Sequence, residues 1–227
     1  MQAEVLYRPS YSVARVTLAP GEAARAEAGV MVAMSPGVTI ETGAQGGIMA
    51  SLKRSVLGGE SFFMNTFRAP GNGPGEVFFA PTLPGDVVAQ QMQGETLLVQ
   101  SGAYLASAES VDVDTKFGGG RTFFASEGLI LLRVSGQGLV LLSSYGAIHE
   151  MTLAAGQQYT VDTGHIVAFS SDMSFNVRRI GGLKSTLLSG EGLVVDIGGP
   201  GRLLIQTRSQ DAFLNWLIPK LPHPRES

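Results

Sequence analysis

The sequence predicts an all-β protein with one short C-terminal helix, and three observations lead to this prediction. Glycine and proline, which break helices, account for 30 and 11 of the 227 residues, well above their usual combined share of about 12%. Segments such as 111–115 and 175–178 alternate apolar and polar residues, which is typical of half-buried strands. One pattern of glycines and apolar runs also occurs three times. These features exclude a helical bundle or a coiled coil.

The repeated pattern contains four features in the same order. A leading glycine precedes an aliphatic residue and alanine, a Gly-Gly pair follows, then a glutamate begins an apolar run, and a Gly-x-Gly ends it. The leading glycines are Gly29, Gly102 and Gly164, and the glutamates are Glu60, Glu127 and Glu191. A unit of about 65 residues is too small to bury much apolar surface alone and gains from packing against its siblings.

We therefore predict three tandem β-sandwich-like repeats in a pseudo-three-fold arrangement. They span residues 1–95, 96–156 and 157–208, and the C-terminal helix and tail occupy 209–227. The run from Gly128 to Val134 is apolar at nearly every position, which predicts a strand buried on both faces. The Gly-x-Gly that follows, Gly136-Gln137-Gly138, predicts a tight hairpin, because glycine adopts positive φ at little cost.

The C-terminal helix has a recognisable start, stripe and stop. The Ser209 hydroxyl can cap it, Asp211 is favourable in its first turn, and Pro219 ends it. An apolar stripe contains Phe213, Trp216 and Leu217. Packing on its own chain is the simplest interpretation of this stripe. Contact with another subunit, for which these three residues are the interface candidates, or contact with a membrane surface remain alternatives.

The equivalent glutamates Glu60, Glu127 and Glu191 are the most interesting polar residues. Three-fold packing could bring them to one axis, where clustered carboxylates bind a cation or share protons. We expect instead that each glutamate begins a strand and bonds to nearby backbone amides. On this interpretation the three carboxylates form no metal site.

Other candidates for chemistry are weak. His149 and His165 are too few for a zinc site, which needs three or four convergent ligands. Ser143, Ser144 and His149 lack the Gly-x-Ser-x-Gly elbow of hydrolases. The run 181–186 resembles a phosphate loop only faintly, because leucine intervenes between glycine and lysine. We expect no catalytic, cofactor-binding or metal-ligating residues, and therefore no enzyme.

Composition narrows the partners and the cellular location. Charged residues are 15% of the chain, against about 25% in an average protein, and the net charge is −3. This balance argues against nucleic-acid binding. The absence of cysteine excludes disulfides and thiolate metal sites. The first residues lack a signal peptide and no apolar run is long enough to span a bilayer, so we expect a cytoplasmic protein.

Three runs carry a family resemblance: residues 143–148, residues 161–169, and Gly190 to Leu193 together with Gln206 to Arg208. They resemble a widespread family with uncharacterised bacterial members and a eukaryotic branch, the altered-inheritance-of-mitochondria group linked to mitochondrial biogenesis. The resemblance covers about residues 24–208 and implies a fold similar to the tryptophan RNA-binding attenuation protein. It supplies no catalytic residues. The mitochondrial role does not transfer, because the chain shows no Arg-rich transit peptide.

The sequence favours a non-enzymatic oligomeric scaffold or interaction protein. Low charge and many apolar residues leave surfaces that usually need covering, so we expect a homo-oligomer. The identity of any protein partner stays open. The alternative is a small-ligand-binding protein that uses a pocket between repeats.

Overall fold

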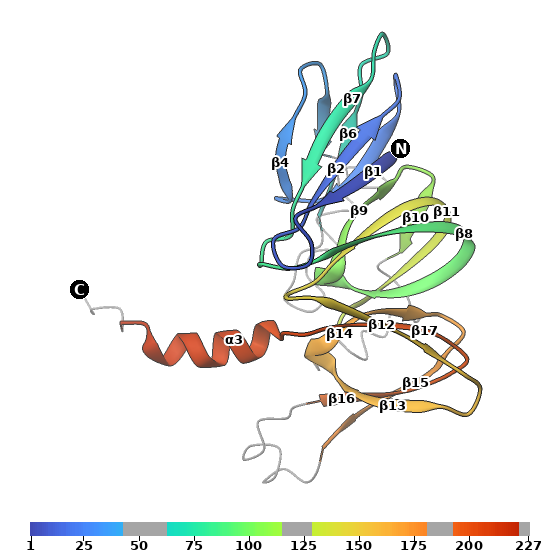
Figure 1. The fold of residues 1–227 in the computed structure, drawn as a ribbon, viewed down its shortest axis with the longest axis vertical. Helices are drawn as coiled ribbons and strands as arrows, with labels where there is room; N and C mark the ends of the chain where they lie inside the picture. The colour runs from blue at the N-terminus through green and yellow to red at the C-terminus, as the bar shows by residue number, and fades with distance from the viewer. Residues whose placement is uncertain (43–62, 115–128, 181–192, 223–227) are drawn as a thin grey trace.

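The computed structural model describes residues 1–42, 63–114, 129–180 and 193–222, and within them the protein is built almost entirely of strands (Figure 1). The described residues form seventeen strands, in sheets of four, ten and three strands, and one short helix after them. The predicted all-β class with a C-terminal helix is confirmed. The strands are β1 (Gln2–Leu6), β2 (Val13–Leu18), β3 (Ala23–Glu27), β4 (Met31–Met34), β5 (Thr39–Thr42), β6 (Met64–Arg68), β7 (Gly75–Phe79), β8 (Val87–Gln100), β9 (Tyr104–Ala108), β10 (Val111–Asp114), β11 (Leu131–Ser143), β12 (Ile148–Leu153), β13 (Gln158–Asp162), β14 (Ile166–Ser170), β15 (Ser174–Arg179), β16 (Leu193–Gly198) and β17 (Gly201–Gln206).

Alternating sequence explains the individual strands. In β2, Val16 and Leu18 are buried, whereas Arg15 and Thr17 between them are exposed. In β10, Val111 is buried and its neighbour Asp112 is exposed. Successive side chains of a strand point to opposite faces, so β2 and β10 each present one face to a core and one to solvent. The alternation predicted for residues 111–115 is confirmed over the part of that segment that forms β10.

The same strand pairings recur along the chain. In the first segment, which contains β1 to β7, β2 pairs with β7, β3 with β6, β4 with β7 and β5 with β6. In the last segment, which contains β12 to β17, β12 pairs with β17, β13 with β16, β14 with β17 and β15 with β16. In the middle segment, which contains β8 to β11, the long strands β8 and β11 pair along nearly their whole length, and β11 also pairs with β9 and β10. This recurrence agrees with the sequence repeat. The pseudo-three-fold arrangement stays a prediction.

The hairpin predicted at Gly136-Gln137-Gly138 is wrong. β11 runs unbroken from Leu131 to Ser143, and a bulge opposite β8 lies between Ser135 and Gln137. Gly136 and Gly138 have φ of +113° and +141°, so they do supply unusual backbone angles, but these bend the strand instead of reversing it. A Cβ on Gly138 would come within 3.0 Å of the Ala108 side chain, which shows how closely the end of β9 approaches.

Two further pairings join the segments. β3 pairs with β9, and β8 pairs with β14, so that the ten-stranded sheet runs through all three segments. The predicted boundary between residues 95 and 96 falls inside β8, and no break in the strand marks it. Figure 1 shows the segments following one another along the long axis of the molecule.

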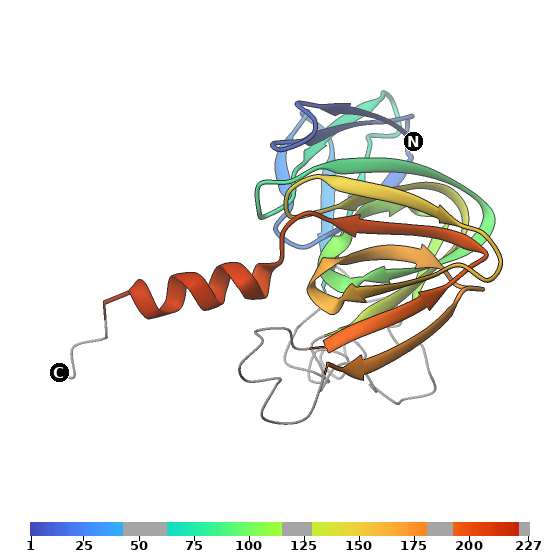
Figure 2. The same ribbon diagram turned by 60° about the horizontal axis from the view of Figure 1, so that its bottom comes forward.

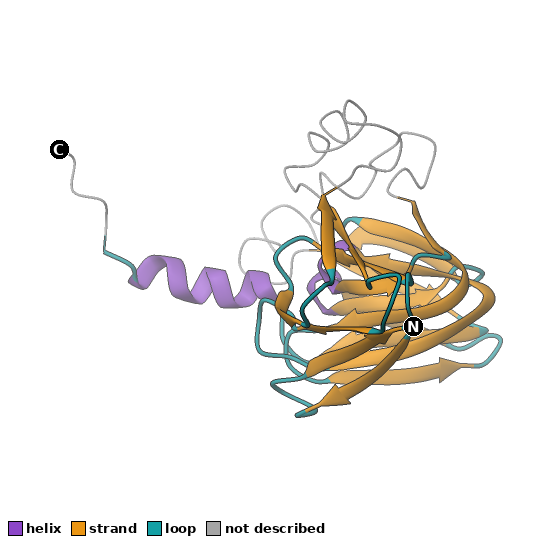
Figure 3. Cartoon of the chain, turned by 90° about the horizontal axis from the view of Figure 1, so that it is seen from above, coloured by secondary structure: helices purple, strands orange, loops and turns teal. Residues whose placement is uncertain are grey.

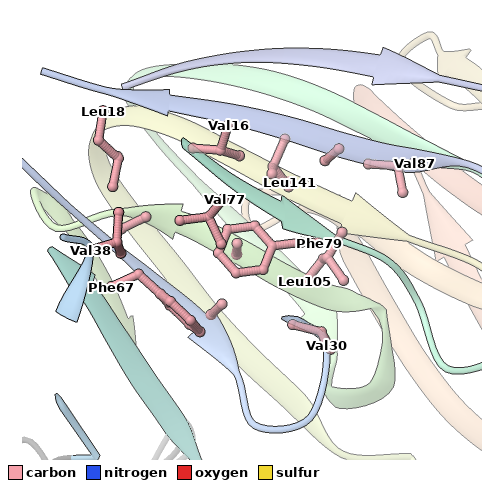
Figure 4. Close-up of a cluster of buried hydrophobic side chains, with 14 of the residues drawn as sticks. Val16, Leu18, Val30, Val38, Phe67, Val77, Phe79, Val87, Leu105 and Leu141 are labelled. Carbon is pink, nitrogen blue, oxygen red and sulfur yellow. The ribbon is translucent and has the colours of Figure 1, made fainter. Parts of the chain in front are cut away.

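Each segment has its own hydrophobic core. The first contains Phe67 and Phe79, whose rings meet edge to face with centroids 5.1 Å apart (Figure 4). Leu105 and Leu141, from the middle segment, complete this core. The second core surrounds Tyr104 and the third surrounds Phe169. Each core also contains residues of a neighbouring segment, so the segments stabilise one another.

The helix α3 spans Gln210–Leu217, and a short 3-10 turn, Ile218–Lys220, follows it. The predicted cap is confirmed, because the Ser209 hydroxyl accepts a hydrogen bond from the Ala212 N–H at 3.4 Å. The helix projects away from the sheets (Figures 2 and 3). It meets the body at its first turns, where the rings of Phe213 and Tyr145 lie edge to face with centroids 6.0 Å apart. It therefore packs on its own chain far less than the simplest interpretation of its sequence suggested.

Candidate functional site

A pocket of about 540 Å³ lies where the three segments meet. One part of its wall comes from equivalent positions of the repeat. Glu27 ends β3, and Gln100 ends β8. Ser101 and Gly102 come directly after β8, and Thr163 and Gly164 lie shortly before β14. Two of the three leading glycines of the sequence repeat therefore line the same pocket, and Glu27 lies two residues before the third.

The rest of the wall comes from the connections that leave the last strand of each segment. These are residues 81–83 after β7, residues 143–145 at the end of β11, and Gln206 at the end of β17. The first turns of α3 close one side with Asp211 and Leu214. A small-ligand site in a pocket between repeats was the alternative expected from the sequence, and it stays a prediction.

Gln206 fixes the geometry of this wall. Its side-chain oxygen accepts a hydrogen bond from the Tyr145 N–H at 2.8 Å, and its side-chain nitrogen donates to the Gly164 carbonyl at 2.8 Å. The Gly164 N–H in turn donates to the Asp162 carboxylate at 2.8 Å. One side chain thus ties the end of the second segment to the turn of the third. These hydrogen bonds hold the two parts of the wall together without an ion pair.

The pocket is polar and carries acidic groups. Its described lining residues include the carboxylates Glu27 and Asp211 and the hydroxyls of Ser143, Ser144 and Thr163, and none of them is a lysine, arginine or histidine. Such a lining offers hydrogen-bond acceptors and donors together. A polar, neutral or cationic molecule suits it better than an anion.

An ion pair between the half-exposed Arg8 and the buried Asp86 lies beside this region, at the junction of the first two segments. Asp86 is 2% exposed and accepts two hydrogen bonds from the Arg8 guanidinium, both at 2.8 Å. The Ser12 hydroxyl donates to the same carboxylate at 2.9 Å, and the Val87 N–H donates at 2.8 Å. Burial raises the pKa of Asp86, but the hydrogen bonds from Arg8, Ser12 and Val87 outweigh it, so the pKa lies below its usual value.

Nothing in the sequence pattern points to this ion pair. Arg8 and Asp86 are 78 residues apart and belong to no shared motif. Neither residue belongs to the repeated pattern. The sequence shows only that charged residues are scarce, at 15% of the chain, and this does not indicate which of them form a pair.

Two of the serines and histidines considered for catalysis, Ser144 and His165, have hydrogen-bond partners within the fold. The Ser144 hydroxyl donates to the Gly146 carbonyl at 2.6 Å and accepts from the Asp86 N–H at 3.2 Å. His149 lies on β12, opposite Ile205 of β17. The His165 Nδ1 lies 2.7 Å from the Gln206 carbonyl oxygen, to which only a protonated nitrogen can donate. The structure therefore assigns packing and hydrogen-bonding roles to Ser144 and His165.

Some predicted residues lie outside the described part of the chain. These are the equivalent glutamates Glu60, Glu127 and Glu191 and the loop-like run 181–186, so their roles stay predictions. Among the described residues, no group of three or more histidine and acidic side chains is placed to hold a metal ion. The interface candidates are described. Trp216 is 58% exposed, and Phe213 and Leu217 are partly exposed.

Comparison with known proteins identifies relatives of similar length. An uncharacterized protein of Streptococcus pyogenes serotype M6 is 27% identical over 220 residues, which are 93% of this chain and 88% of the relative. An X-ray crystal structure of a Streptococcus pyogenes protein matches with a TM-score of 0.80 and 26% identity, over 97% of this chain and 99% of that one.

No helix in the described residues has the length and apolar character needed to cross a membrane. The likeness to the tryptophan RNA-binding attenuation protein stays a prediction. The family model described as mitochondrial biogenesis AIM24 matches residues 3–208, almost the whole β part of the chain. This chain therefore belongs to the AIM24 mitochondrial biogenesis family.

Proposed function

We propose that this protein is a non-enzymatic, self-associating scaffold built from three related β units. The observation that carries the proposal is the position of α3, which projects from the sheets (Figure 2). None of its residues is buried. Trp216, Ile218 and Leu221 are 58%, 59% and 52% exposed. Large aromatic side chains of this kind dominate the binding energy of protein interfaces.

The arrangement around Trp216 supports an interface role. Its ring stacks near Phe213, with centroids 6.3 Å apart, and the Lys220 ammonium lies 4.9 Å from the Trp216 ring centroid. The indole has these two neighbours and is still 58% exposed. A preordered aromatic side chain loses little conformational entropy on binding. We propose a second copy of this chain as the partner.

Trp216→Asp tests the proposal. We expect the substitution to shift the mass towards the monomer of 23.8 kDa in light scattering at micromolar concentration, because it places a charge in the apolar contact. Circular dichroism should still report the β-rich fold, since Trp216 contributes to none of the three cores. The matched control is Asn215→Asp, which adds the same charge at the neighbouring exposed position.

Two results would contradict this expectation. A wild-type chain that is monomeric at these concentrations removes the proposed function altogether. An Asn215→Asp variant that dissociates as strongly as Trp216→Asp would show that the added charge is responsible, and not the loss of the indole.

The pocket favours small-ligand binding as a second candidate function. Its volume of about 540 Å³ lies within the range of about 300–1,000 Å³ that is common for ligand sites. Walls from all three segments would make binding sensitive to how the segments are packed. The pocket also contains polar groups that could orient a ligand.

A thermal-shift screen of polar metabolites tests this candidate. A ligand present at 100 times its Kd should stabilise the protein by about 2.7 kcal/mol. We expect Thr82→Trp, at an exposed position of the pocket wall, to abolish the shift, whereas Thr17→Trp, on the exposed face of β2, should leave it unchanged. A ligand that stabilises both variants equally binds elsewhere.

A further inference from the structure

Two strands at opposite ends of the chain each have an edge that no described strand covers. β4 is the last strand of the four-stranded sheet, whose order is β1-β2-β7-β4. β13 is the first strand of the three-stranded sheet, whose order is β13-β16-β15. In Figure 1, β4 lies in the upper part of the molecule and β13 in the lower part, so the two edges do not meet within one chain.

The equivalent edges inside the chain are paired with each other. β3 of the first segment pairs with β9, and β8 in turn pairs with β14. By the recurring pairings, β13 is equivalent to β3 and to the second half of β8. In the same way β4 is equivalent to β9 and β14, and each of these three strands has a register shift against its partner at the same place, between Met31 and Ala33 in β4.

Burial follows the pairing. The first four residues of β9 and of β14 are buried, whereas all four residues of β4 are exposed. Met31, Val32 and Met34 are 38%, 60% and 40% exposed, although they are as apolar as their buried counterparts. Likewise Tyr159 of β13 is 50% exposed, while Leu97 of β8, which occupies the equivalent position, is 5% exposed. Apolar residues are therefore exposed at these two edges, whereas their equivalents at the internal junctions are buried.

We propose that β13 of one chain pairs antiparallel with β4 of a second copy and so repeats the internal junction between chains. The two internal junctions define the register. Arg25 lies opposite Ser107, and Leu98 lies opposite Phe169. The equivalent pair between chains is Thr160 and Met34, with Val161 opposite Ala33 and Tyr159 opposite Ser35.

A second copy is the occupant because the strands equivalent to β4 pair with the strands equivalent to β13 inside the chain. Pairing would extend the three-stranded sheet of one chain with the four-stranded sheet of the next. It would satisfy the backbone groups of both edges and cover Val32, Met34 and Tyr159. The contact is head-to-tail, so copies add in one direction until they close into a ring or continue as a filament. This inference rests on the proposed self-association and specifies one of its interfaces.

Cysteine cross-linking tests the register directly, because the natural chain contains no cysteine. Thr160→Cys and Met34→Cys are made in separate chains, and both positions are exposed in the single chain. Under oxidising conditions their mixture should give a cross-linked band at twice the chain mass, and a chain that carries both substitutions should give a series of multiples or one closed ring. Asp172→Cys, at an exposed turn, replaces Thr160→Cys in the control mixture, which should give no such band.

A second variant measures the same contact without cross-linking. Val32→Lys with Met34→Lys places two charges on the edge of β4, where both side chains are already exposed, so the fold should persist. We expect association to weaken by about tenfold or more, since charged edge strands resist pairing. A wild-type monomer would contradict both the proposed function and this interface. An oligomer that forms no specific Thr160–Met34 cross-link, and that keeps its mass with both lysines, would overturn this interface alone.

Discussion

Replacing Gly85 with alanine is expected to destabilise the protein by more than about 3 kcal/mol, one of the largest effects of any single substitution in this chain. A Cβ on Gly85 would overlap the carbonyl oxygen of Ser144, which is backbone and has no rotamer to change. The two connections that precede β8 and β12 must therefore move apart. Urea unfolding followed by circular dichroism measures the effect as a lower midpoint.

The loss is large because several backbone hydrogen bonds depend on this close approach. The Asp86 N–H donates to the Gly146 carbonyl at 2.9 Å, and the Gly146 N–H donates to the Pro84 carbonyl at 2.9 Å. The Ser144 N–H also donates to the Asp86 carbonyl at 3.1 Å. Each buried group left without a partner costs about 1–3 kcal/mol. The connections join successive segments, so their separation also loosens the packing between segments.

Gly71→Ala is the matched control for Gly85→Ala. Nothing lies within 4 Å of the position its Cβ would occupy, and its φ is outside the positive region that disfavours alanine. The same chemical change there should alter the free energy of unfolding by no more than about 0.5 kcal/mol. If Gly85→Ala unfolds at the same urea concentration as Gly71→Ala, the tight junction between the connections is not a feature of the protein in solution.

Local signals in the sequence were sufficient for the strands and the helix. Alternation of buried and exposed residues, as in β2 and β10, depends only on strand geometry. The cap at Ser209 and the stop near Pro219 depend on neighbouring residues of the same helix. The direction of α3 was different, because it depends on what the body offers for packing. The sequence of the helix alone carries no information about that surface.

Glycine patterns showed where the backbone is unusual but not what it does there. Gly136 and Gly138 were expected to reverse the chain, yet positive φ serves a bulge as well as a turn. The turn between β9 and β10 favours the bulge, because its Ser110 lies against both glycines. The pocket follows the same logic. The repeat identified Gly102 and Gly164 as equivalent, but only the packing of the segments brings them to one cavity.

Asp86→Asn is expected to destabilise the protein by about 2–4 kcal/mol at pH 7. Asparagine keeps nearly the same shape and one acceptor oxygen, so the cores are preserved. It replaces the other oxygen with an NH₂ donor that faces the Arg8 guanidinium, which is also a donor. Asp112→Asn, at an exposed position of β10, is the control and should change stability by no more than about 0.5 kcal/mol.

The pH dependence of this difference identifies the ionised carboxylate as its cause. The folded pKa of Asp86 lies below the value of about 3.9 expected in the unfolded chain. Its contribution to stability is therefore fully present above the unfolded pKa and is lost as the pH falls through the folded pKa. We expect the gap between wild type and Asp86→Asn in urea midpoint to be constant above a pH of about 5 and to narrow below about 4. A gap that stays the same down to pH 3 would mean that shape and neutral hydrogen bonds, rather than the charge paired with Arg8, hold this junction together.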